Sequence, residues 1–139
     1  MQKVVVDSSV IVKWLNQEKE KLIVQSEKVL EEAQHGMIAL IAPQLARYEI
    51  GNALLKKKLS LRETKDAFSV AYRLPVNFIT ETKSLAKESY RMANEAQITY
   101  YDASFVALAK QENATLVTDN PKHQARVKDV KVVALVNYK

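Results

Sequence analysis

Val4-Val5-Val6-Asp7-Ser8-Ser9 holds, within a few residues, the signals for a buried strand and for the helix that follows it. Three β-branched residues without polar alternation are typical of a central strand that is covered on both faces. Asp7-Ser8-Ser9 then offers side chains that cap helix starts, so we expect a short helix over 10–15. A buried strand that leads straight into a helix favours a parallel sheet.

The rest of the chain repeats this alternation. Apolar spacing predicts helices over 19–34, 43–58, 61–73, 80–96, 101–111 and 121–128. Apolar runs predict strands over 37–42, 115–118 and 132–136, and either a short strand or a plain connection over 76–79. Pro43 is placed in the first turn of its helix, and Ser60 with Glu63 forms a predicted capping box. Strands separated by helices indicate an α/β fold with a mainly parallel sheet.

The composition bounds the class of protein. A chain of 139 residues, 47% of them hydrophobic, is long enough for one domain over 1–139 without disulfides or structural metal. The lack of cysteine excludes a disulfide framework, a zinc ribbon and thiol catalysis. His35 and His123 are too far apart in the sequence to suggest a histidine metal site.

Charge and hydropathy bear on location and partners. The N-terminus lacks the features of a signal peptide and no apolar run spans a bilayer. We therefore expect no membrane association and a cytoplasmic location. The net charge of +5 favours polyanionic partners, and simple solubility explains it equally well.

Aspartate is scarce, and two of the five aspartates directly follow predicted strands. Asp7 follows the strand over 4–6, and Asp119 follows the strand over 115–118. The carboxyl ends of neighbouring parallel strands share one edge of a sheet, where ligands bind. If these two strands are neighbours, both carboxylates face the same crevice.

Two further acids lie on the inward faces of predicted helices. Glu49 has Leu45 one turn before it and Ala53 one turn after it, and a lone charge there is costly unless it is paired or bound to a metal. Asp102 heads the apolar stripe of the helix over 101–111. Both acids should therefore point toward the edge of the core.

Each acid also has an ordinary structural interpretation. The three aspartates suit helix N-caps, and Glu49 suits an ion pair with Arg47 or Lys56. Taken together, four carboxylates without a histidine or a thiol suit a hard cation such as Mg²⁺ or Mn²⁺. Without a cation such a cluster repels itself and raises its own pKa values.

Four segments, in order and spacing, carry a resemblance to a known family. They are Val4 to Ile11, Ala42 to Leu54, Tyr101 to Ala109 and Leu116 to Asn120. They resemble the PIN domain and, within it, the VapC-type toxin ribonucleases. The resemblance implies a Rossmann-like three-layer α/β/α sandwich with an acidic pocket that binds Mg²⁺ or Mn²⁺.

The resemblance carries over Asp7, Glu49 and Asp102 as the three core acids. Asp7 and Asp102 would hold the main ion, and Glu49 would complete the site directly or through water. Family members often show Thr-x-Asp at the fourth motif, whereas the same spacing from Thr118 falls here on Asn120. Either Asp119 takes the fourth role or Asn120 serves as a neutral ligand.

Two hydroxyl side chains lie near the predicted acids in the sequence. The hydroxyls of Ser9 and Thr118 are expected to orient the acids or a bound water. The sequence does not decide whether one ion acts or two, the second lying near Asp119.

The resemblance further implies an endoribonuclease whose product carries a 5′-phosphate. Its implied partners are an RNA substrate, a second copy of the chain and a small antitoxin protein that covers the cleft. Basic and aromatic side chains are candidate RNA contacts, although the basic clusters suit a solvated surface equally and Trp14 suits the core. The candidates are Lys56, Lys57, Lys58, Lys122, His123, Arg126 and Lys128 for phosphate, and Trp14, Tyr100 and Tyr101 for a base.

Three other classes compete with this interpretation. The altered fourth motif favours a catalytically silent RNA-binding module of the same fold. A receiver-like phosphoacceptor domain needs an acidic pair at the end of its first strand, and Ser8 follows Asp7 here. A haloacid-dehalogenase-type phosphatase needs a second aspartate two residues after the first, where Ser9 stands.

Overall fold

The computed structural model describes all residues, 1–139. All strand pairs are parallel and form one sheet in the order β3-β2-β1-β4-β5. The strands are β1 Gln2–Val6, β2 Ile38–Pro43, β3 Val76–Ile79, β4 Thr115–Thr118 and β5 Val132–Ala134. The α-helices are α1 Ser8–Leu15, α2 Ile23–Gln34, α3 Leu45–Lys56, α4 Leu61–Ala71, α5 Lys83–Ala96 and α6 Tyr100–Gln111. Two short 3-10 helices, η1 Gln124–Arg126 and η2 Leu135–Asn137, lie near the C-terminus.

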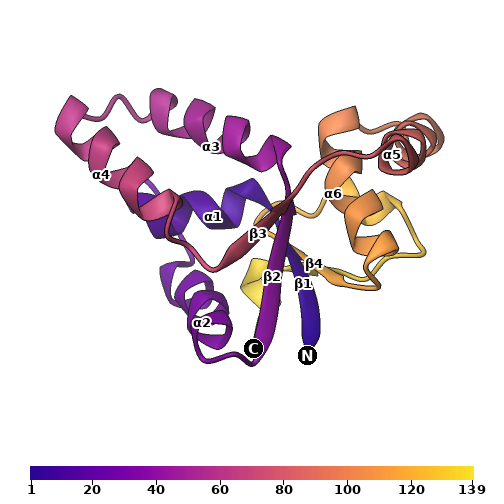
Figure 1. Cartoon of the computed structure of the whole chain (residues 1–139), viewed down its shortest axis with the longest axis horizontal. Helices are drawn as coiled ribbons and strands as arrows, with labels where there is room; N and C mark the ends of the chain where they lie inside the picture. The colour runs from indigo at the N-terminus through magenta and orange to yellow at the C-terminus, as the bar shows by residue number, and fades with distance from the viewer.

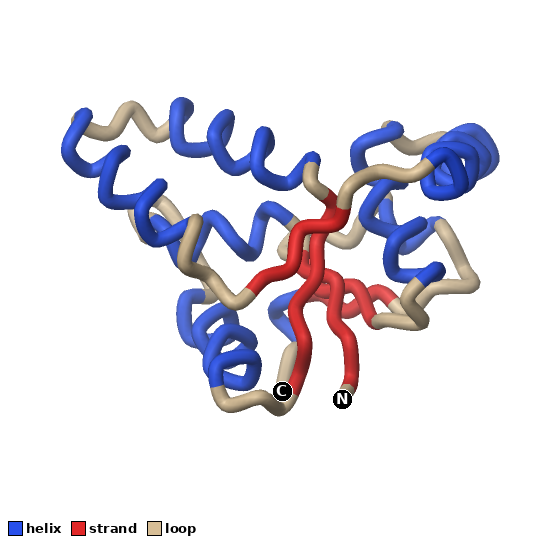
Figure 2. Tube along the Cα trace, viewed as in Figure 1, coloured by secondary structure: helices blue, strands red, loops and turns tan.

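Helices cover both faces of the sheet, as the tube view shows most plainly (Figure 2). α1, α2, α3 and α4 lie on one side of the strands, and α5 and α6 lie on the other (Figure 1). The molecule is therefore a three-layer α/β/α sandwich. The predicted fold class is confirmed.

β1 is the middle strand of the sheet. Val5 pairs with Ile41 of β2 on one side and with Leu116 of β4 on the other. The β-branched run over 4–6 is at most 3% exposed, as expected for a strand covered on both faces. Since the strand order reverses between β1 and β4, a crevice forms at their carboxyl ends.

The first two helices begin at residues other than those predicted. α1 begins at Ser8 because Asp7 is its N-cap, and Asp7 Oδ2 accepts a hydrogen bond from the Ser9 backbone N–H at 3.0 Å. α2 begins at Ile23, so the predicted start at residue 19 is wrong. Lys19 and Leu22 have φ values of 59° and 58°, in the left-handed region, which a right-handed helix cannot include.

The placement of Pro43 in the first turn of a helix is wrong. Pro43 ends β2 and pairs with Ile79 of β3. The backbone N–H of Gln44 then donates to the Ile79 carbonyl at 2.9 Å, so the pairing of the two strands continues past the proline. α3 begins only at Leu45.

Other boundaries follow from local capping. The capping box of Ser60 and Glu63 is confirmed at the start of α4. Residues 76–79 are a paired strand and not a plain connection. α5 begins at Lys83, three residues after the predicted start, because the N-cap is Thr82.

The C-terminal region contains less regular structure than predicted. The helix expected over 121–128 is reduced to η1. The last strand is β5, and the chain then turns into η2. None of the helices combines the length and the apolar content that crossing a membrane requires.

Leu116→Ala should destabilise the protein by about 2–5 kcal/mol, because the substitution leaves a cavity between β4 and the helices. Leu116 is 0% exposed, whereas Leu61 at the start of α4 is 73% exposed. Leu61→Ala is therefore the matched control and should change the unfolding free energy by less than about 0.5 kcal/mol. Urea denaturation checks both values, and equal effects of the two substitutions would contradict the assigned core.

Candidate active site

Three of the predicted acids come from three different elements and lie near the carboxyl end of β1. Asp7 follows β1 directly, Glu49 lies on α3 and Asp102 lies in the first turn of α6. Each of these side chains is half-buried. Asp102 is not the N-cap of its helix, since Thr99 Oγ1 accepts the Asp102 backbone N–H at 3.0 Å.

The charges of these three acids act on one another. Burial raises the pKa of Glu49; the hydrogen bond from Ser8 opposes this, and repulsion by Asp7 and Asp102 adds to it. Burial also raises the pKa of Asp102, repulsion by Asp7 adds to it, and Thr99 and His123 partly offset the rise. The structure therefore brings the three core acids of the sequence analysis within electrostatic reach of one another.

Two polar side chains that sequence reasoning missed fix the orientation of these acids. The Ser8 hydroxyl donates to Glu49 Oε1 at 2.7 Å, and Glu49 forms neither of the ion pairs, with Arg47 or Lys56, that its structural alternative required. The Gln124 amide, 2% exposed, donates to Asp7 Oδ1 at 3.1 Å and to the Asp102 backbone carbonyl at 3.4 Å. Ser8 stands beside Asp7 in the sequence, but nothing there marks Gln124 as buried.

The donor set suits a hard divalent cation in its chemistry. Asp7, Glu49 and Asp102 offer only carboxylate oxygens, the ligands that Mg²⁺ and Mn²⁺ prefer. A bound cation would also relieve the repulsion that raises the pKa values of Glu49 and Asp102. In this conformation no three acidic or histidine side chains are close enough to enclose an ion, so joint ligation requires the carboxylates to draw together.

Asp119 is engaged differently from the other three acids. Its Oδ2 forms an ion pair with Lys13 Nζ at 3.0 Å. Its backbone N–H donates to Ser9 Oγ at 3.1 Å, so Ser9 positions the backbone of this segment. The Lys13 side chain is 1% exposed, and sequence reasoning missed it because a lysine among Val10, Ile11 and Val12 reads as the exposed face of a short helix.

The fourth motif ends in a tight turn. Thr118 is 1% exposed, and its hydroxyl oxygen accepts the Asn120 backbone N–H at 3.3 Å. The Asn120 side chain is exposed to solvent. Thr118 thus shapes the turn that carries Asp119 and Asn120.

Several predicted phosphate contacts are engaged elsewhere. Lys57 Nζ forms an ion pair with Glu20 at 2.8 Å, and its side chain is 9% exposed, so it does not present a free charge. Arg126 donates to the Gln97 carbonyl at 3.0 Å, and Lys128 donates to the Ala125 carbonyl at 3.4 Å. Lys56, Lys58 and Lys122 are exposed and form no ion pair.

Of the three predicted aromatic contacts, two are engaged within the protein and one is exposed. Trp14 is half-buried, packs against the core and donates its indole N–H to the Ser26 carbonyl at 2.7 Å, which confirms its structural interpretation. The Tyr100 hydroxyl donates to Glu81, which raises the pKa of Tyr100 to about 12. Tyr101 is 58% exposed and stays available.

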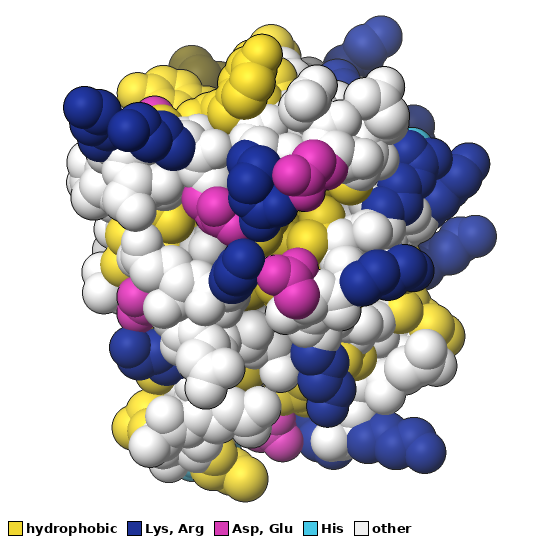
Figure 3. Space-filling view, turned by 90° about the vertical axis from the view of Figure 1, so that its right-hand side faces the viewer, with side chains coloured by type: hydrophobic (Ala, Val, Ile, Leu, Met, Phe, Trp, Pro, Cys, Tyr) yellow, Lys and Arg dark blue, Asp and Glu magenta, His cyan; other side chains and the backbone are white.

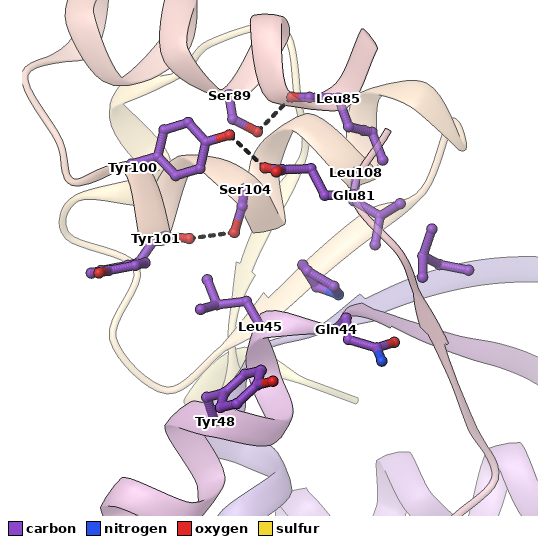
Figure 4. A pocket seen from close by; sticks show the side chains of 12 residues that line it. Gln44, Leu45, Tyr48, Glu81, Leu85, Ser89, Tyr100, Tyr101, Ser104 and Leu108 are labelled. Carbon is purple, nitrogen blue, oxygen red and sulfur yellow. Dashed lines mark hydrogen bonds between the residues drawn. The ribbon is translucent and has the colours of Figure 1, made fainter. Parts of the chain in front are cut away.

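A pocket of about 280 Å³ lies between α3 and α6. Glu49 lines an adjoining pocket that shares Leu45, Tyr48 and Tyr101 with it. Tyr48 precedes Glu49 and Tyr101 precedes Asp102, and the two tyrosines reach the pocket from different helices, α3 and α6 (Figure 4). Leu45 lies between them. Tyr48 is 77% exposed, so an apolar surface lies open beside the candidate site.

The face formed by α5 and α6 carries basic and acidic side chains side by side (Figure 3). Arg91 forms ion pairs with Glu88 and Glu95. Lys110 forms ion pairs with Glu88 and Asp129, each at about 3 Å. Because these acids pair with Arg91 and Lys110, the two cations carry little free charge for a polyanion.

Comparison with known proteins gives a family and a set of folds. The sequence model of the PIN domain matches residues 4–130. No curated protein sequence matches the chain.

Three solved structures share the fold. VapBC2 from Rickettsia felis, bound to a DNA fragment from its promoter, has 17% sequence identity and a TM-score of 0.72 over 96% of this chain and 98% of that chain. VapBC-1 from nontypeable Haemophilus influenzae has 16% identity and a TM-score of 0.68 over 98% and 100%. VapC20 from Mycobacterium tuberculosis, a sarcin-ricin loop cleaving toxin, has 13% identity and a TM-score of 0.65 over 88% and 93%. At these identities the likeness is one of fold.

Glu49→Gln should stabilise the metal-free protein at neutral pH relative to acid pH. Because the pKa of Glu49 is raised above its ordinary 4.5 in the folded state, the folded state binds this proton more tightly than the unfolded state. The stability that the proton contributes is present below about pH 4.5 and is lost as the pH rises through the folded pKa. Glutamine keeps an oxygen for Ser8 and removes this loss.

Urea denaturation in EDTA at several pH values checks this prediction. The unfolding free energy of the variant minus that of the parent should increase with pH. Glu18→Gln, at an exposed position, is the matched control and should leave the difference constant. If the difference in unfolding free energy between Glu49→Gln and the parent also stays constant with pH, the pKa of Glu49 is not raised in the folded state.

Proposed function

Because this chain belongs to the PIN domain family, we propose that it is a metal-dependent endoribonuclease, the toxin of a VapBC-type toxin–antitoxin pair. The observation that carries the proposal is the group of three half-buried carboxylates, Asp7, Glu49 and Asp102, whose burial and repulsion raise the pKa values of two of them. An uncompensated group of this kind suits a divalent cation. The VapBC and VapC structures that share the fold support the choice of toxin class.

We propose that Asp7, Glu49 and Asp102 hold Mg²⁺ or Mn²⁺. A bound ion would supply a Lewis acid for a phosphoryl oxygen and would lower the pKa of a water molecule. Ser8 and Gln124 hold Glu49 and Asp7 in place, because each donates a hydrogen bond to a carboxylate oxygen. Hydrolysis of the RNA phosphodiester would leave a 5′-phosphate.

The chain's own residues would also receive the RNA. His123 lies close enough to Asp102 to lower its pKa, so its ring would lie near a phosphate held at these acids. Lys122 is its exposed neighbour and would contact the next phosphate. Tyr101 offers an exposed ring beside Asp102 on which a splayed base would stack.

The partners form a further part of the proposal. Several structures with the same fold are toxin–antitoxin complexes, which supports a small antitoxin protein for this chain. We propose that a second copy covers the apolar surface around Tyr48 and Leu55, which are 77% and 76% exposed beside the pocket of Figure 4. The cytoplasmic location stays a prediction.

The nuclease is tested by incubating the purified chain, stripped of any bound protein, with labelled total RNA. Cleavage should require Mg²⁺ or Mn²⁺ and should stop in EDTA. Changing a residue that supports a metal ligand costs about 10–100-fold, so loss of a proposed ligand in Asp102→Asn should reduce the rate by at least about 100-fold. Asp66→Asn, at an exposed aspartate of α4, is the matched control and should keep the parent rate.

Either of two results would contradict this proposal. If the parent and Asp102→Asn bind RNA equally and neither cleaves it, the chain is a catalytically silent RNA-binding module. If both cleave RNA at the same rate, the catalytic centre lies elsewhere.

Tyr48→Glu should convert a dimer to a monomer, because it places a charge in the proposed apolar interface. Light scattering should give about twice the 15.8 kDa chain mass for the parent and the single-chain mass for the variant. Tyr90→Glu is the matched control, since Tyr90 on α5 is 67% exposed and lies outside the pocket. A dimer that survives Tyr48→Glu would move the interface to another surface.

A further inference from the structure

Lys13 is a fully buried cation that the proposed chemistry does not use. Its side chain is 1% exposed, and its Nζ lies 3.0 Å from Asp119 Oδ2, 3.1 Å from Glu20 Oε1 and 2.7 Å from the Lys21 carbonyl oxygen. The ammonium group donates hydrogen bonds to Glu20 Oε1 and to the Lys21 carbonyl, and it forms an ion pair with the carboxylate of Asp119. Lys13 is therefore held by three oxygen-bearing groups of the protein itself.

Asp119 is held from α1 at two points. Ser9 accepts the backbone N–H of Asp119, and Lys13 binds its carboxylate. Both residues lie on the helix that Asp7 caps. The carboxylate of Asp119 is consequently fixed relative to Asp7 while its charge is neutralised.

The ion pair extends into a neutral network of two acids and two lysines. Glu20 binds Lys13 through one oxygen and Lys57 through the other, at 3.1 and 2.8 Å. Lys57 also donates to the carbonyls of Asn16 and Glu18 and directly follows α3, the helix of Glu49. The network thus joins the segment before α2, the end of α3 and the turn after β4.

We propose that Lys13 is a positioning residue that reserves Asp119 as its own counter-ion, so that the catalytic centre takes one divalent cation per chain, at Asp7, Glu49 and Asp102. The inference rests on the proposed function. A second cation on Asp119 would lie next to the buried ammonium group of Lys13, which the protein encloses. The two positive charges would repel each other. Lys13 neutralises the negative charge of Asp119 with a fixed positive charge of the protein. A second metal ion would otherwise have that role.

The experiment counts Mn²⁺ bound to the full-length chain by the electron paramagnetic resonance signal of free Mn²⁺. The parent should bind one ion per chain. Asp119→Asn should also bind one ion, with a Kd that changes by less than about 10-fold, because Asp119 is not a ligand. Asp7→Asn is the control for a true ligand and should weaken binding by more than about 10-fold.

Lys13→Met provides the converse test. It removes the cation at similar side-chain volume, so Asp119 becomes free to bind a metal, and a second Mn²⁺ should appear. The second ion should disappear again in the double variant Lys13→Met with Asp119→Asn. If circular dichroism shows that Lys13→Met does not fold, Asp119→Asn decides the question, since that variant leaves Lys13 its contacts with Glu20 and Lys21.

Two ions bound to the parent would overturn the inference, as would a loss of Mn²⁺ affinity in Asp119→Asn as large as in Asp7→Asn. Either result would leave the metal-dependent nuclease intact. Failure of the parent to bind Mn²⁺ would instead contradict the proposed function itself, and this inference with it.

Discussion

The pairing of β1 with β4 is the interaction on which the candidate site depends. The two strands are parallel neighbours at the point where the strand order reverses, so their carboxyl ends open into one crevice. The Asp7 backbone N–H extends this pairing by donating to the Val117 carbonyl at 3.0 Å. Ser9 then binds the backbone of Asp119, so the first and fourth motifs are held together by hydrogen bonds as well as by the sheet.

The protein deals with its acids near this crevice in two ways. Asp119 receives a permanent counter-charge from Lys13. The buried ammonium group has lost its hydration, so it depends on the surrounding oxygen atoms for compensation. Burial and mutual repulsion raise the pKa values of Glu49 and Asp102, and hydrogen bonds to both acids and the charge of His123 near Asp102 offset this only in part. A bound cation would relieve the repulsion at Glu49 and Asp102 more than at Asp119, whose charge is already neutralised. This difference distinguishes the candidate centre from an ion pair formed by the same type of residue.

Sequence patterns predicted the sheet and singled out Asp7, Glu49 and Asp102 among the candidate acids because the signals for them are local; the family resemblance then grouped these three. The β-branched run before Asp7, the apolar neighbours of Glu49 and the apolar stripe after Asp102 are all visible within one element. Lys13 and Gln124 escaped prediction because their partners come from distant segments, and a buried lysine or glutamine has no sequence signature of its own. The start of α2 was misplaced for a related reason: the left-handed residues Lys19 and Leu22 belong to the segment that supplies oxygens to Lys13.

The position of β1 in the middle of the sheet has a consequence for synthesis on the ribosome. β1 is synthesised first, and one of its two edges stays unpaired until β4, near the C-terminus, has been synthesised. Asp102 and Gln124 also belong to the last part to emerge. A nascent chain therefore has no assembled acidic centre until translation is almost complete, so any chemistry of that centre can begin only with the finished chain.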